Sequence, residues 1–358
     1  MSGARQALWT RLQESALVEG DAPPPDPHEA PWFVRAMLGI AGWLGALFLL
    51  GFVGALFSFV MENSIAAILV GSALCAAMVA LFRLFPRGGF IAQFGLAVSL
   101  AGQILILIGL ADIDVLERSS ISWIAMWMAV VQAILFFLIP NFLHRVWTAW
   151  TGTLALAIAL DGWGLDPFSP ALATLALAAV WLAELDHPRQ GSTIRAAGYG
   201  LTLTTLITAF AQGHFGLGGL LLDDEPPLGG WLAVRIGGLL TGVVLVWAVA
   251  RLLRREGVTW DSGAGRIGLA SAAVVALASL EAPGIAPPIV ILILGFANGN
   301  RPLAGLGIVS LLAYLSYYYY SLEATLLQKS ALLIALGVAL LLARLALHRW
   351  WPAGENHA

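Results

Sequence analysis

Apolar runs separated by short polar connections follow one another from Pro31 almost to the end of the chain. Most of these runs approach the ~20 apolar residues that a helix needs to cross a bilayer. Because a backbone in hydrocarbon has no water to satisfy its N–H and C=O groups, each run must form a helix. The pattern predicts an all-α, polytopic membrane protein with about twelve transmembrane helices. They are expected at residues 35–60, 64–84, 90–110, 120–139, 142–160, 170–185, 194–211, 231–253, 266–281, 286–298, 303–319 and 326–347.

The ninth and tenth runs, 266–281 and 286–298, are short. At 1.5 Å per residue the tenth would form a helix about 20 Å long, against a hydrocarbon core of about 30 Å. Two interpretations follow. The runs form either a re-entrant hairpin or two short spans, the tenth borrowing length from flanking residues such as Gly284 and Gly299.

Residues 1–31 are polar and precede the first apolar run. Apolar residues recur at helical spacing from Leu8 to Leu17, which is typical of a short amphipathic helix lying on a membrane surface; a loosely ordered tail is the alternative. The proline-rich stretch 21–27 excludes helix and predicts a stiff spacer. We therefore expect a tail at 1–31, a transmembrane domain at 32–350 and a C-terminal tail at 351–358.

Composition agrees with a membrane location. The chain is 59% hydrophobic and 11% charged, whereas soluble domains carry about 25% charged residues. A net charge of −3 is too small to indicate a nucleic-acid partner. The single cysteine, Cys75, excludes a disulfide within the chain and a thiolate metal cluster.

Basic residues in the connections predict the orientation. If the N-terminus is cytoplasmic, the outer side receives only Arg118, Arg235 and Lys329 of the 18 basic residues. The others fall on the inner side: Arg5, Arg11, Arg35, Arg83, Arg87, Arg145, Arg189, Arg195, Arg251, Arg254, Arg255, Arg266, Arg301, Arg344 and Arg349. An excess of basic residues marks the cytoplasmic side. Both termini are therefore expected in the cytoplasm, and the loop 212–230 on the outer side.

An internal repeat is one interpretation of the segment pattern. The turn from Asn141 to Arg145 resembles the turn from Asn298 to Arg301, and each is followed by a glycine-bearing run. Six helices per half would make the two halves parallel repeats, related by an axis along the membrane normal. The alternative is that short inner turns favour Asn and Arg without any repeat.

Enzyme signatures are missing from the sequence. It contains no P-loop, no His-Glu-x-x-His, no Gly-x-Ser-x-Gly and no strand followed by Gly-x-Gly-x-x-Gly. The 6 histidines fall in loops, helix ends and tails: His28, His144, His187, His214, His348 and His357. We expect no catalytic residues, no cofactor and no metal site.

The densest polar and aromatic chemistry lies between Ser316 and Leu333. Four consecutive tyrosines, 317–320, cannot face one way, since successive residues turn ~100° around a helix. An aromatic belt at the membrane exit explains them, and snorkelling to the headgroups explains Arg235 and Lys329. The alternative is a polar pocket on the outer face, for binding a ligand or partner, built from Tyr318 or Tyr319, Glu281, Glu323 and Lys329.

Two stretches resemble a known family. They are Pro-Trp-Phe-Val-Arg-Ala-Met-Leu-Gly at 31–39 and Tyr-Tyr-Tyr-Tyr-Ser-Leu-Glu-Ala-Thr-Leu-Leu-Gln-Lys-Ser at 317–330. Both are similar to the bacterial family catalogued as domain of unknown function 4401, and the resemblance covers nearly the whole chain. It implies a multi-pass inner-membrane protein without an established activity. It also implies a protein partner on the outer face, because such proteins resemble partners of a membrane-anchored family named for a GDYXXLXY motif.

Two functions from different classes are compatible with the sequence. The favoured one is a non-enzymatic scaffold or subunit of a membrane complex, which contacts the bilayer and a membrane-anchored, periplasm-facing protein. The alternative is a small-molecule transporter or permease, which the possible repeat and the short ninth and tenth runs suggest. The absence of mid-membrane charges counts against transport.

Overall fold

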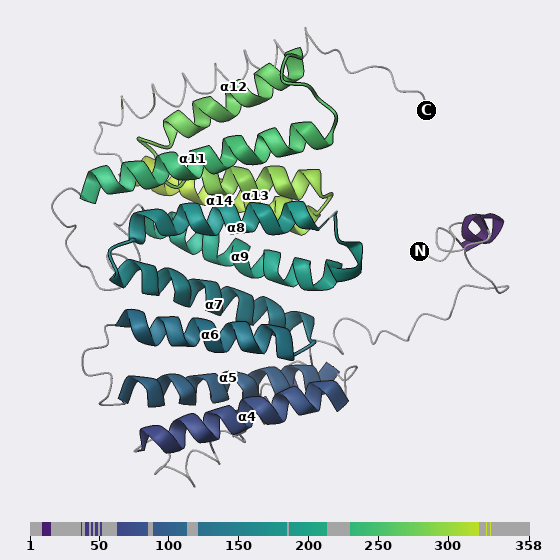
Figure 1. Ribbon diagram of the computed structural model, residues 1–358, viewed down its shortest axis with the longest axis vertical. Helices are drawn as coiled ribbons and strands as arrows, with labels where there is room; N and C mark the ends of the chain where they lie inside the picture. The colour runs from purple at the N-terminus through teal and green to yellow at the C-terminus, as the bar shows by residue number, and fades with distance from the viewer. Residues whose placement is uncertain are drawn as a thin grey trace. The chain divides into compact units, whose positions relative to one another are not determined.

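The computed structural model describes residues 9–15, 63–84, 89–112, 121–184, 186–212 and 230–321, with isolated residues between 37 and 51 and at 327 and 330. Every regular element in these ranges is a helix (Figure 1). The all-α class is therefore confirmed for the described part of the chain. Residues 9–14, inside the predicted amphipathic segment, are helical. The first and twelfth predicted spans, 35–60 and 326–347, lie mostly outside the described residues.

Six described helical stretches are long and apolar enough to cross a membrane, and they indicate a membrane location. They are Ser64–Leu84, Gln93–Asp112, Ile121–Leu138, Asp166–Ala183, Gly230–Arg255 and Arg301–Ser321. The predicted spans at 142–160 and 194–211 form helices that are more polar, and those at 266–281 and 286–298 form shorter apolar helices.

The chain divides into two compact units, residues 1–112 and 113–358. In unit 1, helices α4 (Ser64–Leu84) and α5 (Gly89–Asp112) pack against each other as an antiparallel pair. The Ser64 hydroxyl donates to the Asp112 carboxylate at 2.8 Å and joins the start of α4 to the end of α5. Farther along the pair, the buried Cys75 thiol donates to the Ser99 carbonyl at 3.6 Å.

Unit 2 is a bundle in which helices far apart in sequence become neighbours (Figure 1). α7 packs between α6 and α9, α9 packs on α8, and α11 contacts α8, α12 and α13, while α14 packs on α13. The elements are α6 (Ile121–Leu138), α7 (Phe142–Gly162), the 3-10 helix η2 (Asp166–Phe168), α8 (Ser169–Ala183), the 3-10 helix η3 (Pro188–Gln190), α9 (Gly191–Gln212), α11 (Gly230–Arg255), α12 (Gly263–Ala278), α13 (Ala286–Ala297) and α14 (Arg301–Ser321).

The two short helices α12 and α13 are separated by a turn over 279–285. α12 packs mainly on α11, α13 packs mainly on α14 and also contacts α11, and α12 and α13 make little contact with each other. This arrangement corresponds to two short helices rather than to a hairpin whose arms pack together. The core beside them is apolar and is centred on Trp181 of α8, Leu245 of α11 and Ile291 of α13.

The buried face of α9 in unit 2 is polar, in contrast to the apolar core around Trp181. Thr202, Thr204, Thr205 and Thr208 of α9 are all buried. The Thr202 hydroxyl donates to a carbonyl one turn earlier in its own helix, and Thr204 contacts Thr153 of α7 at 2.6 Å between hydroxyl oxygens. Hydroxyl pairs of this kind link helices in membranes, where association has no hydrophobic driving force.

Large apolar residues cover the outside of unit 2. Trp127, Phe137, Phe296 and Val309 are each more than half exposed. A protein whose outer surface is this apolar requires a hydrocarbon environment or a partner that covers it.

Candidate functional site

Polar side chains of unit 2 gather at two opposite ends of the bundle. The first, which we call the tyrosine end, contains the C-terminal turns of α14, the start of α11 and the turn 279–285. The second, the arginine end, contains the starts of α7, α9 and α14 and the ends of α8, α11 and α13. The described residues of the sequence-predicted site, Glu281, Tyr318 and Tyr319, belong to the tyrosine end.

At the tyrosine end, α14 is tied to the turn 279–285 by two tyrosine hydroxyls. Tyr314 donates to the Pro283 carbonyl at 2.5 Å, and Tyr318 donates to the Glu281 carbonyl at 3.3 Å. Their rings stack with centroids 6.2 Å apart. The structure therefore brings together Tyr318 and Glu281, two of the predicted site residues, through the backbone of Glu281.

The Glu281 carboxylate is paired with Arg235 of α11, at 2.9 Å from its guanidinium. Arg235 also lies over the Trp231 ring, 5.3 Å from its centroid. The sequence interpretation explained Arg235 by snorkelling alone, whereas its guanidinium is held by a carboxylate and an aromatic face. The two side chains are 43% and 69% exposed, so the pair stabilises the fold by no more than ~1 kcal/mol.

The other tyrosines point to different surroundings, as the helical turn requires. The Tyr317 ring packs on Phe210 of α9 with centroids 4.8 Å apart. Tyr319 packs edge-on against Tyr320, which is 81% exposed. The two remaining residues of the predicted pocket, Glu323 and Lys329, lie outside the described residues.

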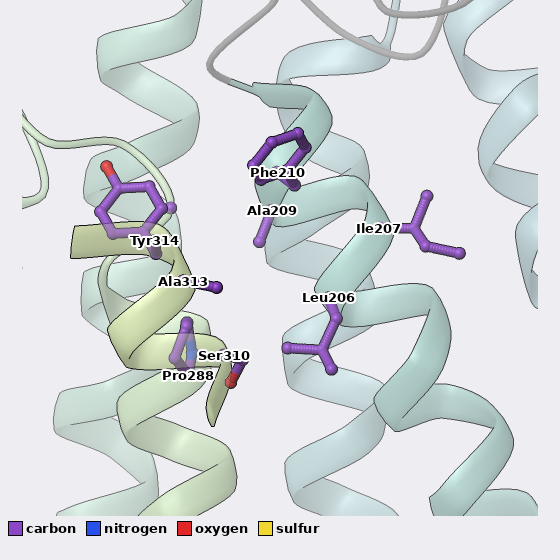
Figure 2. Close-up of a pocket in the computed structure, with 9 residues that line it drawn as sticks. Leu206, Ile207, Ala209, Phe210, Pro288, Ser310, Ala313 and Tyr314 are labelled. Atoms are coloured by element: carbon purple, nitrogen blue, oxygen red, sulfur yellow. The ribbon is translucent and has the colours of Figure 1, made fainter. Parts of the chain in front are cut away.

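An apolar cavity of about 320 Å³ lies beside the tyrosine end, between α9 and α14 (Figure 2). Figure 2 shows Leu206 extending from α9 toward α14, and Phe210 of α9 and Ser310 and Tyr314 of α14 complete this part of the lining. Pro288 of α13 also lines it. The lining offers few hydrogen-bonding groups, so the cavity suits hydrocarbon rather than a polar substrate.

A polar cavity of about 330 Å³ lies at the arginine end, where α8, α9, α13 and α14 meet. Its charged lining residues are Glu184, Arg195 and Arg301. The Arg195 guanidinium donates to one Glu184 oxygen, and the Asn298 side chain donates to the other at 3.4 Å. The Glu184 side chain is only 10% exposed, so these two donors offset the cost of burying its charge.

The turn between α13 and α14 builds one wall of this cavity. Gly299 has a φ of 61°, in the left-handed region that L side chains rarely adopt. Asn300 then caps α14 by accepting from the Leu303 amide at 3.2 Å, and it also accepts from the Tyr199 hydroxyl at 3.0 Å. A tight glycine turn and one asparagine thus fix α14 against α9.

Asn300, rather than Asn298, matches Asn141 in role. Asn141 caps α7 by accepting from the amide of His144, three residues later, as Asn300 does for Leu303. The proposed alignment of the two turns paired Asn141 with Asn298, which instead lies at the end of α13 and donates to α8. The boundary between the compact units also falls after residue 112 and not between the sixth and seventh predicted spans.

Comparison with known proteins assigns the chain to a family. The family model described as a domain of unknown function, DUF4401, matches residues 31–350. The chain belongs to the DUF4401 family. No curated protein and no solved structure matches it.

For this DUF4401 chain, sequence reasoning located part of the tyrosine end and missed the cavity at the arginine end. The sequence placed Arg195 and Arg301 only among the basic residues of the inner side. Asn298 and Trp181 are 117 residues apart, so only the tertiary structure brings them together. The available signal was the Asn-Gly-Asn-Arg turn at 298–301, in which both asparagines carry side-chain hydrogen bonds.

Within the described ranges, no three His, Cys, Asp or Glu side chains lie close enough together to hold a metal ion. His144, on the first turn of α7, is fully buried.

Proposed function

We propose that this DUF4401 chain is a non-enzymatic scaffold or subunit of a complex in the bacterial inner membrane, and that its tyrosine end binds a protein partner. The observation that carries the proposal is the exposure of aromatic and arginine side chains at this end, with Trp231 and Arg235 on α11, beside Glu281, and Tyr320 on α14. Aromatic residues and arginine are enriched at protein interfaces and dominate their binding energy.

A membrane-anchored partner with a domain on the outer side fits this surface. The ion pair between Arg235 and Glu281 holds two exposed charges in fixed positions, and fixed charges at an interface favour one orientation of the partner. The apolar cavity next to Tyr314 could hold an apolar side chain from the partner's membrane anchor.

Site-specific photo-crosslinking in native membranes tests the proposal. A benzoylphenylalanine replaces Tyr320 at the tyrosine end, and a matched one replaces Trp260, which is 60% exposed at the arginine end. We expect a discrete crosslinked membrane protein with an outer-side domain from the first position only. The same crosslinked products from both positions, or adducts with lipid alone, would mean that the tyrosines form only an aromatic belt.

The finer topology is part of the same proposal. We infer that twelve spans cross the membrane with both termini in the cytoplasm, so that the tyrosine end faces the periplasm. The excess of basic residues at the predicted inner connections supports this orientation. A parallel repeat of six and six helices remains the arrangement to test by superposing residues 64–185 on residues 231–347 in an experimental structure.

A small-molecule transporter is the second candidate. Its support is the pair of short helices α12 and α13 joined by the non-helical turn 279–285, since interrupted helices line binding sites in several transporter folds. Against it, the ion pairs recorded in the described part of unit 2 all lie at helix ends. Uptake assays in reconstituted vesicles would favour transport only if a solute gradient drives flux that depends on this turn.

A further inference from the structure

The polar cavity at the arginine end has more free donors than acceptors. Both Glu184 oxygens are occupied, one by Arg195 and the other by Asn298. Arg195 uses only its Nε for that contact, and its side chain is 61% exposed. Its two terminal amino groups are therefore available to a ligand.

Arg301 adds a second guanidinium to the same cavity. In the part of the chain that the structure describes, no ion pair or hydrogen bond is recorded for its side chain. Among the other lining groups, Tyr199 donates to Asn300, and the Asn298 side-chain oxygen is a buried acceptor without a hydrogen-bond partner. With Glu184 paired to Arg195, the charged side chains of the lining carry a net charge of +1. The free N–H donors of the two guanidinium groups outnumber the one free acceptor, the Asn298 oxygen.

The chemistry that matches this surface is a phosphate group. Guanidinium groups form paired N–H···O bonds with phosphate oxygens and stay charged at any physiological pH. The cavity also lies where the apolar helix α8 ends and the apolar helix α14 begins. If these helices cross a bilayer, this position is at the depth of the lipid headgroups. Basic pockets between helix ends on the cytoplasmic side are known binding sites for anionic headgroups.

We infer that the cavity lined by Arg195, Arg301 and Glu184 binds a phosphate group, carried by an anionic phospholipid or by a free phosphate. A cavity of about 330 Å³ accommodates one phosphate with part of its glycerol. This inference does not depend on the proposed partner, which would bind the opposite end of unit 2.

Thermal unfolding of the full chain in detergent provides the binding assay, because a ligand that binds only the folded state raises the midpoint. Three additives are titrated: dioleoyl phosphatidylglycerol, dioleoylglycerol with the same acyl chains, and inorganic phosphate. We expect phosphatidylglycerol to raise the midpoint and dioleoylglycerol to leave it unchanged. If inorganic phosphate also raises the midpoint, the phosphate group alone is sufficient for binding. If phosphatidylglycerol raises the midpoint and inorganic phosphate does not, the cavity is a lipid headgroup site.

The Arg301→Gln variant tests whether the cavity is responsible. The Arg301 side chain is exposed, so the variant should fold with an unchanged midpoint in the absence of ligand. We expect its apparent Kd for the stabilising additive to be about tenfold weaker, which corresponds to the loss of one charge-assisted contact. Arg301→Lys should retain part of the affinity.

The matched control is Arg266→Gln, at the same end but outside the cavity, where the guanidinium donates to the Asp261 carbonyl. It should bind the additive as the unsubstituted chain does. Equal weakening by Arg266→Gln and Arg301→Gln would mean general attraction to a basic surface and would overturn the inference. A lack of stabilisation by both phosphate-bearing additives would overturn it as well.

Discussion

The Asn298 side chain donates a hydrogen bond to the Trp181 carbonyl at 3.0 Å and thereby links the end of α13 to the end of α8. The last four carbonyls of a helix have no partner within the helix. Trp181 is fully buried, so water cannot satisfy its carbonyl easily. Arg255 of α11 donates to the neighbouring Leu182 carbonyl, and two distant helices therefore supply the end of α8 with donors.

Asn298→Ala should lower the stability of unit 2. The substitution removes the donor to Trp181 and the second donor to the Glu184 carboxylate, and an unsatisfied buried acceptor costs about 1–3 kcal/mol. Thermal unfolding in detergent would measure the loss. Gln190→Ala, at an exposed position of η3, is the control and should change stability by less than about 0.5 kcal/mol. If both variants unfold at the same midpoint, the hydrogen bonds of Asn298 do not contribute to stability.

The close approach of α7 and α9 gives a second prediction. A Cβ atom at Gly200 would lie 2.6 Å from the backbone nitrogen of Trp150 and 2.5 Å from the Ala149 Cβ. Gly200→Ala should therefore force the two helices apart and cost about 1–3 kcal/mol. Glycine-to-alanine in a helix otherwise stabilises by up to about 1 kcal/mol.

Gly305→Ala in α14 is the matched control, because no atom lies within 4 Å of its added Cβ. Unfolding midpoints of the two variants should move in opposite directions. A Gly200→Ala protein as stable as Gly305→Ala would mean that α7 and α9 do not pack as closely as the structure has them.

The pair of Arg235 and Glu281 gives a third prediction, through a double-mutant cycle. Arg235→Ala and Glu281→Ala should show a coupling of about 0.2–1 kcal/mol, the range for exposed ion pairs. The coupling should fall as salt is raised, because exposed charges are screened. Arg254→Ala, which removes a guanidinium 4.7 Å from the Trp260 ring at the other end, should show no coupling with Glu281→Ala. A cycle for Arg235 and Glu281 without coupling would contradict the pairing.

The helices could be predicted from the sequence far better than their partners. Runs such as 64–84 became α4 at the same residues because apolar length alone determines a helix in lipid. The ion pair of Glu281 with Arg235 joins residues 46 apart, whereas the sequence offered Lys329 as the cation beside Glu281. Charge signs select candidates for pairing, but only helix packing decides which candidates meet.

The more polar helices show the same limit. The sequence predicted spans over 142–160 and 194–211, and α7 and α9 form there with buried threonines. Thr153 and Thr204 form a hydrogen bond with each other across the two helices, so packing compensates for the polarity of both hydroxyls. Hydropathy along the chain scores each helix by itself and cannot register such a pair.

The last prediction concerns the orientation of the two ends. Cys75 is the only cysteine of the chain and is buried, so a Cys75→Ala background leaves no thiol. Single cysteines then replace Trp231 or Tyr320 at the tyrosine end, and Gln190 or Glu256 at the arginine end, all of which are exposed. Spheroplasts treated with a membrane-impermeant maleimide report which positions face outward.

We expect Trp231→Cys and Tyr320→Cys to label in intact spheroplasts, and Gln190→Cys and Glu256→Cys to label only after the membrane is opened. The reason is that Arg145, Arg195, Arg255 and Arg301 lie at the arginine end, and an excess of basic residues remains in the cytoplasm. The reversed pattern would overturn the orientation and move the proposed partner to the cytoplasm. Labelling of one position from each end in intact spheroplasts would contradict the grouping of these helix ends into two opposite faces.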